Sequence, residues 1–113
     1  PILTVAGYPD SLTLSPALSA SAFVVVNGTA NHISSDWEIR KVSDNSLVWS
    51  SIGDTSNKTS ITASGLKVLT QYKVRVKYNS DLYGSSSWVE VVGTTLNIYV
   101  ENPIHTNRLT IKL

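Results

Sequence analysis

Two histidines, His32 and His105, are the residues of this chain best suited to exchange protons near neutral pH or to bind a transition metal. They lie far apart in the sequence, and neither belongs to a His-x-x-x-His pair or a similar ligand spacing. His32 falls in a segment that we predict to be a loop, and His105 falls near the C-terminus. The pattern favours solvated or hydrogen-bonded loop histidines over catalytic ones.

Carboxylates are the other groups that could do chemistry, and they are spread over the whole chain. They are Asp10, Asp36, Glu38, Asp44, Asp54, Asp81, Glu90 and Glu101. No run of them has the alternating oxygen ligands of a calcium loop, and no nucleophile elbow is present. The absence of cysteine excludes disulfides and thiolate metal sites. We therefore predict no enzyme activity, no catalytic or metal-binding residue and no cofactor.

Basic residues gather in the segment QYKVRVKY (Gln71–Tyr78). Its tyrosines and valines alternate with cations, and a period of two places the two sets on opposite faces of a strand. The cations are Lys73, Arg75 and Lys77. Glu38 and Arg40, on a strand expected to lie beside this one, add mixed charges to the same face. We interpret this face as solvated sheet surface with cross-strand ion pairs. An anion or glycan site and contact with a neighbouring subunit or domain are the alternatives.

Composition narrows the class of protein. The 113 residues suit one domain, and 42% hydrophobic residues are enough for a packed core. The formal net charge of +1 argues against nucleic acid as a partner, because nucleic-acid binding usually requires a strong basic excess. No run of 18 apolar residues occurs, so we predict no membrane insertion.

The elements that carry these residues are predicted to be strands. Apolar residues fall in short runs separated by Gly, Asn, Asp, Ser and Pro, at intervals typical of an all-β sandwich. We predict seven strands, at residues 11–16, 18–26, 35–42, 46–52, 59–63, 71–78 and 88–95. Residues 96–113 hold two further alternating runs around Asn102-Pro103. They predict a C-terminal β extension, a linker or the start of a following domain.

Two segments resemble the fibronectin type III family. GLKVLTQYKVRV (Gly65–Val76) is similar to its signature, in which a leucine and a threonine precede a Tyr-x-Val-x-Val strand. GSSSWVEVVGTT (Gly84–Thr95) is similar to the last strand of the family. The resemblance covers about residues 1–95. It implies a seven-stranded fibronectin type III or immunoglobulin-like β-sandwich.

The resemblance also assigns structural roles. It implies a tyrosine corner, in which the Tyr72 hydroxyl bonds to the backbone near Leu66 or Lys67. The expected structural residues are Phe23, Trp37, Leu66, Tyr72, Val74, Val76 and Trp88. One departure stands out: the family carries its core tryptophan on the second strand, where this chain has Phe23, and Trp37 falls on the third.

The combination HISSDWEIRKV and LVWSS is similar to type III-like domains of bacteriophage tail fibre and tail tip proteins. This resemblance implies a structural or spacer domain of an extracellular fibre in the virion tail. The expected partners are neighbouring domains or subunits of the fibre, including copies of this chain, and a host surface protein or glycan. The alternative is an accessory or recognition module of a secreted bacterial carbohydrate-active enzyme, or of an adhesin on the cell surface.

Two surface features follow from strand alternation. Trp88 is expected on the wet face of its sheet, partly exposed and stacked against Arg75 or Lys77, whereas Trp37 is expected between the sheets. The loop predicted at residues 79–87 carries Leu82 and Tyr83 among serines and glycine. Tyrosine in this setting is typical of adaptable binding loops, so we identify these two residues as a candidate contact loop.

Overall fold

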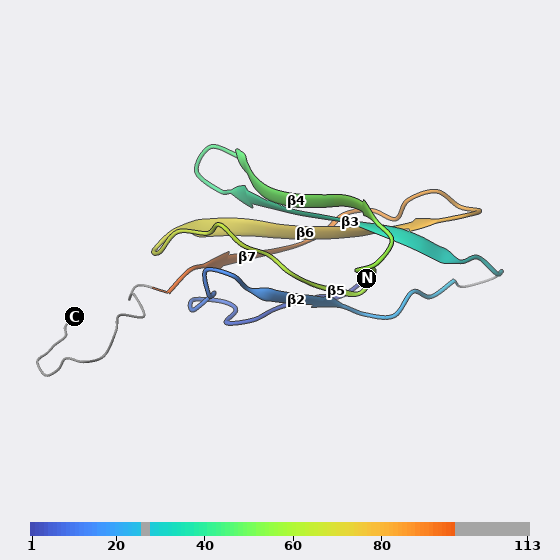
Figure 1. Ribbon diagram of the computed structural model, residues 1–113, viewed down its shortest axis with the longest axis horizontal. Helices are drawn as coiled ribbons and strands as arrows, with labels where there is room; N and C mark the ends of the chain where they lie inside the picture. The colour runs from blue at the N-terminus through green and yellow to red at the C-terminus, as the bar shows by residue number, and fades with distance from the viewer. Residues whose placement is uncertain (26–27, 97–113) are drawn as a thin grey trace, which may run out of the picture.

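The computed structural model describes residues 1–25 and 28–96, and within these ranges its regular secondary structure consists of strands (Figure 1). There are seven: β1 (Leu3–Val5), β2 (Ala17–Ala20), β3 (His32–Lys41), β4 (Leu47–Asp54), β5 (Ser60–Thr62), β6 (Gln71–Ser80) and β7 (Val89–Thr94). The prediction of an all-β protein is confirmed.

The strands form two antiparallel sheets that lie one above the other as the layers of a β-sandwich (Figure 1). The smaller sheet has the order β1-β2-β5, and the larger has the order β4-β3-β6-β7. The third, sixth and seventh strands are neighbours in one sheet, as predicted. Their register places Glu38 opposite Arg75 and Arg75 opposite Glu90, so the charged residues line one face.

The count of seven was predicted correctly, but the first strand was misplaced. Residues 11–16 are not a strand. They belong to the loop between β1 and β2, where Leu12 is buried and forms an isolated bridge to Thr95. The first strand is Leu3–Val5, which is too short to show a clear alternation. A turn at Gly7, with φ of 83°, separates it from this loop.

The second predicted strand, residues 18–26, was too long. β2 ends at Ala20, because the following residues leave the sheet and Phe23 packs against the ring of His32 instead. β3 begins at His32, three residues before the predicted start, so His32 lies on a strand and not in a loop. Trp88 immediately precedes β7 rather than opening it.

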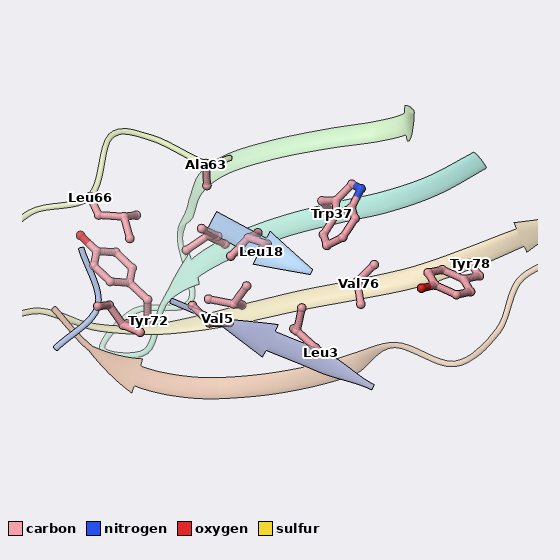
Figure 2. Close-up of a cluster of buried hydrophobic side chains, with 12 residues drawn as sticks. Leu3, Val5, Leu18, Trp37, Ala63, Leu66, Tyr72, Val76 and Tyr78 are labelled. Atoms are coloured by element: carbon pink, nitrogen blue, oxygen red, sulfur yellow. The ribbon is translucent and has the colours of Figure 1, made fainter. Parts of the chain in front are cut away.

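The core lies between the sheets and follows strand alternation (Figure 2). Trp37 and Ile39 on β3 and Val74 and Val76 on β6 are fully buried. They face the buried residues of the smaller sheet, which are Leu3, Val5 and Leu18. Full burial of one such aliphatic side chain stabilises the fold by about 1.5–3 kcal/mol. The Trp37 indole donates a hydrogen bond to the carbonyl of Asn57 at 2.7 Å, so its one polar atom is satisfied.

The tyrosine corner is present at the start of β6. The Tyr72 ring is buried beside Leu66, and its hydroxyl accepts a hydrogen bond from the Lys67 amide at 2.9 Å (Figure 2). This bond ties the connection between β5 and β6 to the core. The expected C-terminal extension at 96–113 lies, apart from Leu96, outside the described residues.

Replacing Tyr72 with Phe should lower the free energy of unfolding by about 0.5–1.5 kcal/mol, because the hydrogen bond to the Lys67 amide is lost while the ring stays buried. Urea denaturation followed by tryptophan fluorescence measures this change. Tyr8→Phe, on an exposed ring, is the matched control and should leave the stability unchanged. Equal stability of the Tyr72→Phe variant and the wild type would show that the corner contributes nothing.

Candidate functional site

The outward face of the larger sheet has Glu38 at its centre. This buried carboxylate accepts hydrogen bonds from Arg40 Nε at 2.8 Å and from Arg75 Nη1 at 2.7 Å. Burial alone would raise the pKa of Glu38, but the two guanidinium groups more than offset it and hold the pKa below its ordinary value. Glu38 is therefore an ionised anchor for both arginines.

Further ion pairs extend this network. Arg75 Nε lies 3.3 Å from a Glu90 oxygen without the alignment of a hydrogen bond, and Lys77 Nζ lies 3.7 Å from Asp36. Asp36 also accepts hydrogen bonds from the Gly53 amide and from the Asn79 side chain. The cations Arg75 and Lys77 are thus both paired, which favours a solvated ion-pair ladder over an anion-binding site.

Trp88 packs against the two cations of this ion-pair ladder. Its ring lies 4.4 Å from Arg75 Cζ and 4.9 Å from Lys77 Nζ, and it is partly exposed. The predicted contrast with the buried Trp37 is confirmed, and with it the assignment of faces. Because the two cations cover the indole, a large aromatic side chain on the wet face needs no ligand to explain it.

The candidate contact loop lies between β6 and β7, at one end of the sandwich. It is a tight turn in which the Ser80 amide bonds to the Gly84 carbonyl at 2.8 Å and the Tyr83 amide bonds to the Ser80 hydroxyl at 2.8 Å. Gly84 completes the turn with φ of 73°, which favours glycine. Leu82 and Tyr83 project from it with 66% and 61% of their surfaces exposed.

Asn31 and Asp81 clamp this turn to the loop between β2 and β3. The Asn31 amide and side-chain nitrogen donate to the two Asp81 carboxylate oxygens at 2.8 and 2.9 Å, and the Asp81 amide donates to the Asn31 carbonyl at 3.2 Å. The bonds from Asn31 lower the pKa of Asp81. No sequence signal indicates this clamp, because Asp81 falls in the loop predicted at residues 79–87 and Asn31 lies 50 residues away.

Tyr83 also reaches the second loop. A Cβ atom at position 28 would lie 2.5 Å from the Tyr83 hydroxyl oxygen, so only glycine leaves room for the ring in this orientation. The turn is therefore held by its own hydrogen bonds and by the clamp. A loop that is ordered in this way loses little conformational entropy on binding, so it is suited to presenting Leu82 and Tyr83 to a partner.

His32 lies at the same end of the sandwich, in an aromatic cluster with Phe23 and Tyr78. Its ring centroid is 5.1 Å from that of Phe23 and 4.0 Å from that of Tyr78. His32 Nε2 is 2.8 Å from the Ser35 hydroxyl oxygen. That hydroxyl donates its only proton to the Lys58 carbonyl at 2.5 Å, so Nε2 must carry a proton and donate it to Ser35.

Burial of His32 lowers its pKa below the ordinary value, and the nearby Lys58 ammonium group lowers it further by a smaller amount. A hydrogen bond with the Ser34 backbone raises the pKa, but this effect is weaker. Lys58 itself donates to the His32 carbonyl at 3.0 Å. These contacts give His32 a structural role in joining β3 to the connection between β4 and β5.

Groups suited to chemistry stay apart in the described part of the chain. No set of three or more His, Asp or Glu residues there is arranged to hold a metal ion. Asp54 accepts hydrogen bonds within a turn. Those from the Ser51 hydroxyl, and next in size those from Asn57, lower its pKa to about 2.

No helix among the described residues is long and apolar enough to cross a membrane.

Comparison with models of known protein families, with curated proteins and with solved structures found no match. Function must therefore be argued from the fold and from the two surfaces described above, the ion-pair face and the loop end.

Replacing Asp81 with Ala should loosen both loops at this end, because all hydrogen bonds that its carboxylate accepts from Asn31 are lost. Hydrogen exchange of amides at residues 28–31 and 81–85 should become faster, while the core strands keep their protection. Asp44→Ala is the matched control, since Asp44 is also an exposed turn residue that accepts bonds from Ser46. Unchanged exchange at both loops would contradict the clamp.

His32 should titrate below pH 6.5, and its lowered pKa makes the folded state lose stability as the pH falls. The unfolded chain takes up a proton at about pH 6.5, before the folded chain does, so this contribution is complete above that pH and declines below it. NMR titration and urea denaturation at several pH values measure both quantities. His32→Gln should remove this part of the pH dependence. A His32 pKa above 6.5 would show that stacking on Phe23 and Tyr78 favours the imidazolium.

Proposed function

We propose that this chain is a fibronectin type III-like spacer domain of an extracellular fibre, most similar in kind to those of bacteriophage tail fibre and tail tip proteins. The observation that carries the proposal is the path of the chain. Ile2 is hydrogen-bonded to Ser21 in the half of the sandwich that carries the contact loop, whereas Leu96 is bonded to Leu12 and Leu69 at the opposite end (Figure 1). This displacement along the long axis suits a domain that adds length to a fibre.

The sheet order supports the type III assignment. An immunoglobulin constant-type sandwich divides its strands so that the fourth pairs within the sheet of the first, second and fifth. Here β4 pairs with β3 in the other sheet. The hydrogen bond from Lys67 to Tyr72, just before β6, agrees with the tyrosine corner that the resemblance implies.

Exposed apolar residues at both ends support contacts with neighbours along the fibre. Leu82 and Tyr83 lie at the loop end. Leu69, 67% exposed, and Tyr8 lie at the opposite end, close to where the described chain stops. The ion-pair face between them is polar. This distribution suits end-to-end linkage to neighbouring domains or subunits, for which neither a cofactor nor a chemical step is needed.

The ordered turn with Leu82 and Tyr83 favours a second candidate, a recognition module. In a tail fibre it would touch a host surface protein or glycan. In the alternative setting it would serve as an accessory module of a secreted bacterial carbohydrate-active enzyme or of an adhesin. The exposure of both side chains on a clamped turn is the observation that supports contact of either kind.

The polypeptide on both sides of this domain distinguishes spacer from accessory module. We expect fibre or baseplate segments next to it, and a hydrolase domain in the same chain would overturn the spacer assignment. Recognition is tested separately by applying the isolated chain to glycan and host-surface-protein arrays. Loss of binding in Leu82→Ser and Tyr83→Ser, but not in Leu69→Ser at the opposite end, is expected for a recognition loop. Absence of binding in the wild type would leave only the spacer role.

A further inference from the structure

The four sheet edges differ in how well they are protected. β1 and β5 are edges of only three residues each. The loop after β1 covers only the end of β7, where Thr94 donates to the Pro9 carbonyl and Leu12 donates to the Thr94 carbonyl. Among the edges in the described part of the chain, β4 is the longest, with eight residues.

β4 lacks most of the devices that keep edge strands from pairing with other molecules. It contains no lysine, arginine or proline, and its one charged residue, Asp54, is its last. Register shifts in its pairing with β3 introduce a bulge near each end. Between the bulges, Trp49–Ser51 pair regularly with β3. On an antiparallel edge strand, alternate residues direct their backbone N–H and C=O groups away from the sheet. The bulges therefore confine any added strand to the middle of β4.

The side chains of β4 are arranged so that the strand complements itself. Ser50 lies opposite Glu38, on the outward face of the sheet, and is exposed. Leu47 and Ile52 lie on either side of it with 51% and 61% of their surfaces exposed. A two-fold axis at Ser50 would place Ile52 of each copy opposite Val48 of the other, next to Leu47. It would also keep the two Asp54 carboxylates at opposite ends of the contact, away from each other.

We propose that a second copy of this chain pairs antiparallel with the first along β4, joining the two larger sheets into one continuous sheet. A two-fold contact of this kind uses the same patch on both copies, as most homodimers do. It contributes new backbone hydrogen bonds at the centre and two apolar contacts at the flanks. The contact is lateral, so it is independent of the end-to-end spacer role and adds side-by-side association to it. Because the paired stretch is short, the dimer should be weak and depend on concentration.

Disulfide trapping tests the pairing directly, because the chain contains no cysteine of its own. Residues directly opposite each other in an antiparallel pair have Cβ atoms about 4.5–5.5 Å apart, close to the reach of a disulfide. Ser50→Cys should form a covalent dimer on mild oxidation at high protein concentration. Ser19→Cys, an exposed serine on the central strand of the smaller sheet, is the matched control and should stay monomeric.

Sedimentation equilibrium of the full chain provides the second measurement. The wild type and Ser19→Lys should self-associate as the concentration rises, whereas Ser50→Lys should stay monomeric because two lysines would meet at the axis. Circular dichroism of each variant verifies that it is folded. A wild type that is monomeric at all concentrations would overturn the proposal. So would a dimer that persists in Ser50→Lys, or one that Ser19→Cys traps as efficiently as Ser50→Cys.

Discussion

The pairing of β3 with β6 is the interaction on which the rest of this structure depends. Both strands have ten residues, and they are paired along almost their whole length. One face of the pair supplies the centre of the core, with Trp37 opposite Val76 and Ile39 opposite Val74. The other face holds Glu38 opposite Arg75, so a single register both buries the apolar side chains and pairs the opposite charges. A slip by one residue would bury the cations and expose the core, which gives this register a large energetic advantage.

Features that rest on this alternation were accessible from the sequence. The all-β class, the outward position of Glu38 and Arg75, the burial of Trp37 and the stacking of Trp88 all follow from a period of two within long strands. The hydrogen bond of Tyr72 was accessible for a different reason, because a local motif places the ring and the Lys67 amide only five residues apart. Each of these inferences needed only a short stretch of chain, or two strands whose adjacency the fold class implied.

Features that rest on contacts between distant loops were not accessible. The strand predicted at 18–26 looked continuous because its residues are β-prone, but stacking of Phe23 on His32 draws the chain away from the sheet after Ala20. His32 was placed in a loop because no local pattern marks the first residue of a bulged strand. The Asn31–Asp81 clamp joins two loops, and nothing in the sequence of either loop indicates that they are in contact. At such positions tertiary packing outweighs local propensity, and one sequence does not reveal which distant partner prevails.

The opposite placement of the two ends has a mechanical consequence. Tension applied at Ile2 and Leu96 would run parallel to the strands, so it would shear the sheet ladders, and the hydrogen bonds of a ladder would have to break together rather than one at a time. β1 is held to β2 by a register of three residues, whereas β7 is held to β6 by six. Under rising force the N-terminal strand should therefore detach first. The remaining strands would keep the Trp37 core closed, so the domain would lengthen by one short step before it unfolds.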